Sequence, residues 1–471
     1  MRAFRADICV IGAGSGGLSV AAGAAQMGAR VVLIEAGEMG GDCLNTGCVP
    51  SKALIAAAGR AQATREGGLG VAGTEPQVDF AAVMAHVKTT IAAIAPHDSQ
   101  QRFEGLGVTV LRDFARFTGP DTVEAGGTRV TARRFVLATG SRPLVPPIPG
   151  LDGVPYLTNE TVFELSELPA HLLVLGGGPI GIELAQAFRR LGAGVTVVEA
   201  ARALGREDPE LAAAVLENLR QEGVEIVEGA RATEVRGQAG ALELVTESGR
   251  AISGSHLLVA VGRQPAIAGL GLEAAGIATE TGAVKTGRDL RTTNRRVYAI
   301  GDVAGRGAFT HLAGYHAGLI LRPMLFALPA RLRDDHVPRV TYADPELAQV
   351  GLTEAEARAR YGDGIEVLRA PFAANDRALA EGRTEGLAKV IVRRGRPVGA
   401  GIAGAGAGEL IGLWALALSR RDKLSAIAGM ILPYPTQSEV SKRAAGAYFS
   451  PRLFDSALVK RVVRLVQRRL P

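Results

Sequence analysis

The chain has 471 residues, a formal charge of +6 and only three cysteines. This length predicts two to four domains with ample core, and three cysteines exclude a structural disulfide framework. Many glycines with few aromatic residues favour a tightly turned α/β architecture, and the modest charge without a nucleic-acid motif predicts no nucleic-acid partner.

The first predicted element is a buried parallel strand at residues 6–14, which runs into the pattern G-x-G-x-x-G and then an alanine-rich helix to about Met27. A second strand, residues 30–34, ends at Glu35. In such a unit the glycines let the backbone approach a pyrophosphate, the helix N-terminus stabilises its charge, and the acid binds ribose hydroxyls. The unit predicts a dinucleotide site. Its glycines are Gly12, Gly14 and Gly17.

Cys43 and Cys48 follow, five residues apart, in a glycine-rich run that ends in Gly-Cys-Val-Pro-Ser-Lys. Five residues of undistorted helix rise about 7.5 Å, which exceeds the usual Cα separation of a disulfide, about 4.4–6.8 Å. The glycine and the proline would therefore have to bend the segment for the sulfurs to meet. A helix predicted over residues 51–64 places Cys48 near its N-terminus and Lys52 one turn on, and both features favour a thiolate.

This run resembles the redox-active disulfide of the FAD-dependent pyridine nucleotide–disulfide oxidoreductases, the family of dihydrolipoamide dehydrogenase, mercuric reductase and glutathione reductase. The resemblance implies FAD at the first glycine unit, with Gly41 among the flavin-binding residues. It also implies a reducible Cys43–Cys48 disulfide, in which Cys48 lies nearest the flavin and Cys43 exchanges with the acceptor.

The region between this run and the second glycine unit is predicted as a helix over residues 79–101, followed by short antiparallel strands at 108–117 and 122–130. The next strand ends in a small-residue turn at Thr139 and Gly140, which resembles the family's second flavin-domain signature. A cluster of prolines after that turn marks a domain boundary.

A second strand–glycine–helix unit follows, and its second strand, residues 194–198, ends at Glu199. Two such units imply two dinucleotides, and the resemblance assigns this one to the nicotinamide coenzyme. A phosphate on the ribose would meet the like charge of Glu199, so NADH is expected over NADPH; Arg202 and Arg206 lie close enough to weaken that preference. The glycines of this unit are Gly176, Gly178 and Gly181.

Further site residues carry over from the family by their motifs. Glu183 matches a glutamate that pairs with the lysine of the disulfide helix, here Lys52; a solvated helix carboxylate is the alternative. Gly262, in Val-Gly-Arg-Gln-Pro, closes the nicotinamide domain. The run that ends in Ala-Ile-Gly301-Asp302 matches the third flavin signature, in which the aspartate binds the ribityl chain.

From about residue 337 the pattern resembles the family's dimerisation domain; its G-x-G-x-x-G at residues 399–404 has no acid-ending strand after it and is rejected as a cofactor loop. Dihydrolipoamide dehydrogenase and glutathione reductase carry a histidine before a Pro-Thr, held by a following glutamate. Here Tyr434 stands in that place, with Glu439 after it, which is similar to mercuric reductase, although that enzyme's C-terminal cysteine pair and N-terminal metal-binding module are missing. The resemblance implies that the partner chain of a two-fold dimer contributes both residues.

The last predicted element, residues 453–470, is an amphipathic basic helix. Docking on a membrane surface and packing on the body of the protein are both open, and packing is favoured. The apolar face comprises Phe454, Leu458, Val462 and Leu465, and the basic face comprises Lys460, Arg461, Arg464 and Arg468.

The sequence thus predicts an α/β fold of two Rossmann-type dinucleotide-binding domains, for FAD and for NAD, plus a C-terminal α+β dimerisation domain. We expect an FAD-dependent NAD(P)H disulfide oxidoreductase that passes electrons between NADH, FAD, the Cys43–Cys48 disulfide and an acceptor, with no resident metal. Its substrate is expected to be a small disulfide, dithiol, quinone or metal ion. Dihydrolipoyl dehydrogenase and a flavin-based redox sensor are the alternatives to the mercuric reductase-like interpretation. The reducible cysteine pair and the lack of a visible leader or spanning apolar run predict a cytoplasmic location. The expected domains are FAD-binding at 1–150 and 268–336, NAD(P)-binding at 151–267, and dimerisation at 337–471.

Overall fold

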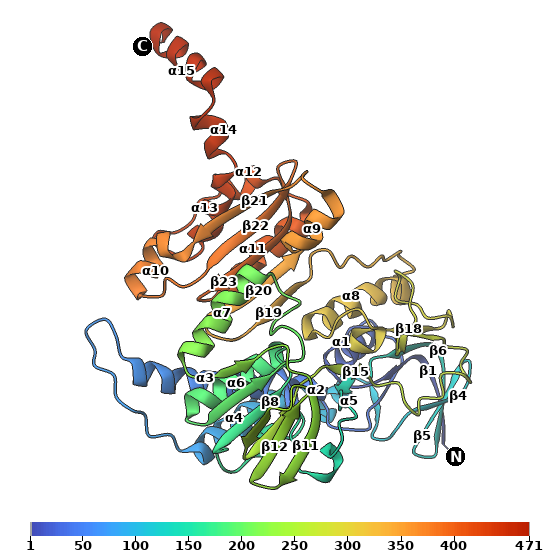
Figure 1. Cartoon of the computed structure of the whole chain (residues 1–471). Helices are drawn as coiled ribbons and strands as arrows, with labels where there is room; N and C mark the ends of the chain where they lie inside the picture. Colours follow the sequence, from blue (N-terminus) through green and yellow to red (C-terminus); the bar gives the residue numbers. More distant parts are fainter. Residues whose placement is uncertain (1, 471) are drawn as a thin grey trace.

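The computed structural model describes residues 2–470 and confirms the mixed α/β fold (Figure 1). The two dinucleotide-binding units lie side by side in the lower part of the view, and the C-terminal sheet stands above them. The chain ends in helices that extend beyond that sheet.

The first sheet is built around β1 (Arg2–Ile11), with the order β3-β2-β1-β6-β5-β4 and with β18 paired to β6. Strand β1 pairs in parallel with β2 and β6, and β18 pairs in parallel with β6, whereas β5 is antiparallel to β6. The end of β1 is buried, as expected inside a parallel sheet. Cys9 lies there, fully buried, and its burial raises the pKa of its thiol. The other strands are β2 (Val31–Ile34), β3 (Thr109–Leu111), β4 (Arg116–Gly119), β5 (Thr122–Ala125), β6 (Thr128–Leu137) and β18 (Val297–Ala299).

Three predictions for the middle of this unit are wrong. The strand expected at 122–130 is divided by a turn at Gly126 and Gly127 into β5 and the start of β6. Residues 108–117 do not form one antiparallel strand: a bend, in which Asp113 accepts a hydrogen bond from the next backbone N–H, divides them into β3, parallel to β2, and β4. The helix expected at 79–101 is also divided, because Pro96 lacks the N–H that an α-helix needs. The pieces are α4 (Phe80–Ile94), η1 (Ala95–Asp98) and α5 (Gln100–Gly105).

Two helices share a core with the first sheet, α1 (Ser15–Gln26) and α8 (Thr310–Phe326). They approach closely because α1 presents glycines to α8: a Cβ on Gly16 would lie 3.2 Å from that of Ala313, and a Cβ on Gly23 only 2.8 Å from Leu321. This contact brings the start of α8 next to the cysteine segment.

The cysteine segment consists of α2 (Gly41–Asn45) and α3 (Cys48–Glu66). Helix α3 begins at Cys48 itself, three residues before the predicted start, because Pro50 fits within the first turn, where an N–H has no intrahelical partner. It packs against α4 and against α6 (Pro179–Leu191), the helix of the second glycine unit.

The second unit repeats this architecture with a sheet in the order β10-β9-β8-β14, all parallel. An antiparallel sheet, β11-β12-β13, follows it in sequence, and an antiparallel pair of β7 with β15 joins the two units. The elements are β7 (Ser141–Pro143), β8 (His171–Leu175), β9 (Gly194–Val198), α7 (Pro209–Gln221), β10 (Glu225–Val227), β11 (Ala232–Gln238), β12 (Ala241–Thr246), β13 (Ala251–Gly254), β14 (His256–Val259) and β15 (Arg263–Pro265).

The C-terminal part forms an antiparallel sheet in the order β19-β20-β23-β22-β21. Residues 399–404 lie inside its strand β23, in agreement with their rejection as a cofactor loop. The strands are β19 (Pro338–Thr341), β20 (Glu346–Gly351), β21 (Glu366–Pro371), β22 (Leu387–Arg393) and β23 (Arg396–Gly404), and the helices are α9 (Glu354–Tyr361), α10 (Asp376–Glu381), α11 (Ala407–Arg420), α12 (Leu424–Ala428) and α13 (Glu439–Ala447).

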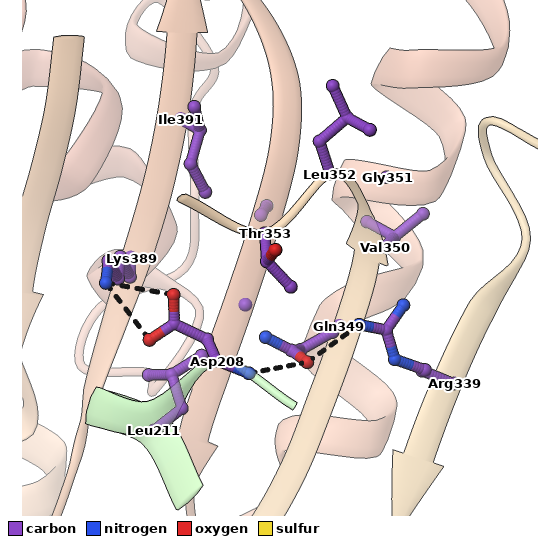
Figure 2. Close-up of a pocket in the computed structure, with 12 residues that line it drawn as sticks. Asp208, Leu211, Arg339, Gln349, Val350, Gly351, Leu352, Thr353, Lys389 and Ile391 are labelled. Carbon is purple, nitrogen blue, oxygen red and sulfur yellow. Dashed lines mark hydrogen bonds and ion pairs between the residues drawn. The ribbon is translucent and has the colours of Figure 1, made fainter. Parts of the chain in front are cut away.

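A buried ion pair joins this sheet to the second unit (Figure 2). Lys389 on β22 donates hydrogen bonds of 3.0 and 2.9 Å to both carboxylate oxygens of Asp208, which also caps the N-terminus of α7. Both residues are almost completely buried. The backbone N–H of Asp208 donates to Gln349, which also accepts a bond from Arg339, so the contact is fully hydrogen-bonded.

The C-terminal helix differs from the favoured expectation. It forms as α14 (Ser450–Phe454) and α15 (Ala457–Arg469), and it projects away from the body of its own chain (Figure 1). Ser456 caps the start of α15 by accepting a bond from Val459, so the chain changes direction before the apolar face reaches the sheet. No residue of α15 is buried. No helix within residues 2–470 has the length and hydropathy to cross a membrane.

Candidate active site

The two glycine units show the same steric pattern, which explains their outer glycines. A Cβ on Gly12, whose φ is +104°, would lie 2.3 Å from the carbonyl oxygen of Ala138, and a Cβ on Gly17 would lie 1.9 Å from that of Gly12. The corresponding distances in the second unit are 2.5 Å for Gly176 and 2.0 Å for Gly181. Any larger residue at these four positions would clash with backbone, so the strand-to-helix turn itself requires glycine.

The middle glycines have no such intramolecular reason. A Cβ on Gly178 would meet nothing within 4 Å, and one on Gly14 would meet only the Cα of Gly41, at 4.0 Å. Both residues lie at the N-terminus of a helix, where backbone N–H groups favour a phosphate. The open space at these two positions fits a pyrophosphate that approaches the backbone closely.

The acids at the ends of the second strands are also equivalent. Glu35 accepts hydrogen bonds from the backbone N–H groups of Ala13, at 2.5 Å, and of Gly37, at 2.7 Å. Glu199 accepts from the N–H groups of Gly177 and Ala201, both at 2.8 Å. Each carboxylate therefore holds its glycine loop in position and lies where a ribose could bind. Arg202 and Arg206 are exposed near Glu199.

Residues of the later flavin motifs meet at the joint between the two units. Thr139 donates to the carbonyl of Ala266 at 2.8 Å, beside Gly140. Asp302 accepts a 2.5 Å bond from Ser141, which in turn accepts a 2.8 Å bond from Arg263, the residue after Gly262. Burial raises the pKa of the Asp302 carboxyl. Gly301 has a φ of +67° and turns the chain between β18 and this aspartate.

The cysteine pair lies next to the start of α8. Both thiols are free in this structure, and Cys43 is half-buried whereas Cys48 is exposed in the single chain. The sulfur of Cys48 lies 3.4 Å from the hydroxyl of Thr310. Asn159 fixes the loop between the cysteines by donating to Asp42 and to the carbonyl of Thr46.

The two thiols have opposite acidities. A hydrogen bond from the Cys43 thiol, together with Thr310 and the charge of Lys52, lowers the pKa of Cys48 to about 6, against the effect of burial. The same hydrogen bond and burial raise the pKa of Cys43. At neutral pH the pair therefore holds one thiolate, on Cys48, at the N-terminus of α3 where the helix dipole also favours it.

Lys52 is held in place by an ion pair with Glu183 on α6, with 2.7 Å between Nζ and Oε2. The second oxygen of Glu183 accepts a 2.8 Å bond from the backbone N–H of Tyr342, which follows β19. Lys52 also lies over the ring of Tyr342, 4.4 Å from its centre. The buried Glu183 carboxylate thus joins the cysteine helix, the second unit and the C-terminal part.

Replacing Lys52 by Met should raise the pKa of Cys48 by about one unit, because it removes a positive charge that stabilises the thiolate. The pH dependence of the iodoacetamide alkylation rate measures this pKa. Lys52→Arg, which keeps the charge, is the control and should shift the pKa less. An unchanged pKa in Lys52→Met would show that Cys43 and Thr310 alone set it.

A cavity of about 410 Å³ reaches the cysteine pair. Cys43 lines it, together with residues of α1, η1 and α5 and with Thr310. Asp98 and Arg102 supply its charged groups, and burial raises the pKa of Asp98. A small acceptor in this cavity could reach the sulfur of Cys43.

Tyr434 lies in the loop before α13 and is exposed. Its hydroxyl donates a 2.8 Å hydrogen bond to Asp376 on α10, and this contact raises the pKa of the tyrosine. Glu439 does not contact it; within residues 2–470, Oε2 of Glu439 is buried and has no hydrogen-bond partner. The geometry therefore differs from the family pattern, in which the glutamate holds the side chain before the Pro-Thr.

Comparison with known proteins gives the family. The family model described as "Pyridine nucleotide-disulphide oxidoreductase" matches residues 6–317, and the model of the same family's dimerisation domain matches residues 337–445. The chain belongs to the pyridine nucleotide-disulphide oxidoreductase family. It is an FAD-dependent oxidoreductase that uses a nicotinamide coenzyme, and its dimerisation domain indicates a homodimer.

Among relatives, mercuric reductase of Streptomyces lividans is 36% identical over 459 residues, covering 94% of this chain and 96% of the relative. Dihydrolipoyl dehydrogenase of Thermus scotoductus is 37% identical over 462 residues, covering 94% and 97%. A solved structure of the HOCl-induced flavoprotein disulfide reductase RclA from Escherichia coli, as a Cu(II) complex, is similar with a TM-score of 0.85 and 29% identity, covering 94% and 99%. The solved structure of LpdA from Mycobacterium tuberculosis is similar with a TM-score of 0.86 and 28% identity, covering 95% of this chain and 100% of that one.

Several residues of the oxidoreductase's site were missed by the sequence analysis. Thr310 and Asp376 are distant in sequence from Cys48 and Tyr434, and no motif marks them. Arg263 could have been found from the sequence, because it follows Gly262 in the motif Val-Gly-Arg-Gln-Pro. Asp98 lies inside the helix predicted over residues 79–101 and Arg102 directly follows it; because that prediction has no break at Pro96, it gives no sign of the cavity.

Proposed function

We propose that this oxidoreductase takes electrons from NADH and delivers them through the Cys43–Cys48 pair to a small disulfide or a soft metal ion, in the manner of mercuric reductase rather than of dihydrolipoyl dehydrogenase. The observation that carries the proposal is Tyr434. Its hydroxyl donates to Asp376 and its pKa is raised, so it remains protonated at neutral pH and is a poor base for a dithiol substrate.

FAD, when bound, passes the two electrons of the nicotinamide hydride to the disulfide. The residues that would hold it are the first glycine unit with Glu35 and, at the joint, Thr139 and Asp302. The chain's own part is to keep Cys48 as a thiolate after reduction and to leave Cys43 in the cavity. There the Cys43 thiol would pass its proton to the Cys48 thiolate along their hydrogen bond and then attack an acceptor disulfide or bind a metal ion. Closure of the Cys43–Cys48 bond would deliver two electrons to the acceptor, and the leaving thiolate of an acceptor disulfide would take up the proton.

The proposed active site is shared between two chains. The match to the dimerisation domain supports this, as does Tyr434, whose side chain is 71% exposed in the single chain and is therefore accessible to a second one. In a two-fold dimer, Tyr434 and Glu439 of one chain would complete the acceptor side of the other. A reducible cysteine pair of this kind favours a cytoplasmic location, which is part of the proposal.

NADH should have a higher kcat/KM than NADPH, because Glu199 would face the extra phosphate with a like charge. Glu199→Arg should shift the preference toward NADPH by tenfold or more, about 1.4 kcal/mol. Glu199→Gln, which can still accept a bond from the backbone of the glycine loop, should remove most of the discrimination and leave NADH turnover little changed. A wild-type preference for NADPH would show that Arg202 or Arg206 binds the phosphate.

The test of the function is a panel of acceptors assayed with both coenzymes: mercuric and cupric ions, small disulfides, lipoamide and quinones. Turnover of a metal ion or disulfide well above that of lipoamide supports the proposal. Efficient lipoamide turnover would favour dihydrolipoyl dehydrogenase, for which the 37% identical relative is the supporting observation. Failure of every acceptor would favour the flavin-based redox sensor.

A further inference from the structure

Helix α15 presents an unpartnered apolar face. Leu458, Val462 and Leu465 are 69%, 51% and 51% exposed. Residues three and four apart share one face of a helix, so these side chains form a continuous strip with Val466 and Leu470. A strip of this kind in water marks a binding surface.

The opposite face of α15 is basic, with the uncharged Gln467 beside its cations. Residues 457–470 contain five lysines and arginines and no acidic residue. None of these cations forms a salt bridge within residues 2–470, whereas arginines of the body such as Arg30, Arg369 and Arg452 do. The cations of α15 are Lys460, Arg461, Arg464, Arg468 and Arg469.

The position of the helix separates it from the catalytic machinery and from the family's dimer contact. The dimerisation match ends at residue 445, before α14 begins at Ser450. In Figure 1 the two terminal helices extend from the far side of the C-terminal sheet, away from both dinucleotide units. The helix therefore lies outside the residues that match the dimerisation domain and away from both dinucleotide units.

We propose that α15 docks the enzyme on an anionic phospholipid bilayer. A strip of aliphatic residues opposite a face of lysine and arginine, with no acid, is the arrangement of helices that lie in the plane of a membrane interface. At 13 residues the helix is about 20 Å long, too short to cross the hydrocarbon core. Pairing with α15 of another copy would gather ten cations, five from each chain, on one short two-helix unit with no acid to offset them, which disfavours that occupant.

The basic face strengthens this interaction. Electrostatic attraction to the surface should contribute about fivefold in partitioning for each cation near it. Binding should accordingly weaken as salt is raised.

The test is sedimentation of the full-length holoenzyme with vesicles of phosphatidylcholine, with and without phosphatidylglycerol. Wild type should sediment only with the anionic vesicles. Arg461→Gln/Arg464→Gln should reduce partitioning about 25-fold, and Leu458→Ser/Val462→Ser should reduce it about tenfold or more. Truncation after Asp455, which removes α15, should abolish it.

Matched controls change equally exposed residues on the body. Arg231→Gln/Arg236→Gln and Leu69→Ser/Val71→Ser should bind the vesicles as wild type does, and all variants should keep their FAD and NADH oxidation. Vesicle binding that survives the truncation would overturn the proposal. Equal binding to neutral and anionic vesicles would also overturn it. So would a smaller assembly of the truncated protein in analytical ultracentrifugation, because it would show that another copy of the chain covers the apolar strip.

Discussion

Cys48→Ser should lower NADH-driven acceptor reduction by at least about 10³-fold, because it removes the sulfur that alternates between thiolate and disulfide. In wild type the pKa of Cys48 is about 6, below that of an ordinary thiol, so the thiolate persists as the pH falls until about pH 6. The long-wavelength thiolate-to-flavin absorbance that NADH produces should be absent from this variant. The alkylation step near pH 6 should disappear with it.

Two substitutions at Cys43 separate its role in acceptor reduction from its hydrogen bond to the Cys48 thiolate. Cys43→Ser and Cys43→Ala should both lose acceptor reduction, yet both should keep the absorbance, since Cys48 remains. Serine can still donate a hydrogen bond to the thiolate and alanine cannot, so the pKa of Cys48 should rise more in Cys43→Ala. Loss of the absorbance in Cys43→Ser but not in Cys48→Ser would reverse the assignment of the two sulfurs.

Tyr434→His should raise dihydrolipoamide oxidation by about 10²–10⁴-fold, the usual contribution of a positioned general base. Tyrosine has an ordinary pKa near 10, and the bond to Asp376 raises it further, whereas histidine titrates near 6.5. The buried, unpartnered Oε2 of Glu439 is a ready acceptor for one imidazole N–H, which would orient the ring. Steady-state assays with dihydrolipoamide and NAD⁺ measure the gain.

Two controls define the reason for that gain. Tyr434→Phe should leave the weak lipoamide activity unchanged, because the tyrosine hydroxyl is not the base. Tyr434→His/Glu439→Gln should lose part of the gain if the carboxylate holds the ring. Robust lipoamide turnover by wild type would contradict the explanation that the protein lacks a base. Another group would then have to act as the base, and Asp98 in the cavity would be the first to examine.

The sequence predicts the fold well wherever local chemistry and tertiary structure agree. The strand–glycine–helix units form as expected, since Gly12 and Gly17 are required by contacts within the same unit. Strand β9 has the predicted bounds. Errors fall where a single residue overrides a periodic pattern: Pro96 ends α4, and the bend at Asp113 divides a predicted strand.

The site is predicted less completely, because many of its contacts join residues far apart in sequence. The pKa of Cys48 depends on Thr310, 262 residues away. Tyr434 is recognised as unusual from its motif, but its partner Asp376 lies on another helix with no motif of its own. The free direction of α15 is likewise invisible in sequence, since an amphipathic pattern shows that an apolar face exists and not what covers it.

The buried carboxylates between domains bear on how such enzymes can be recombined. Exchanging the nicotinamide domain with that of a relative, in order to change the coenzyme, would place the relative's residues in the positions of Glu183 and Asp208, opposite the recipient's Lys52 and Lys389. Losing one partner of a buried pair costs about 3–5 kcal/mol. A chimera must therefore move each acid together with its lysine, so the units of exchange are these cross-domain pairs and not the domains between their linkers.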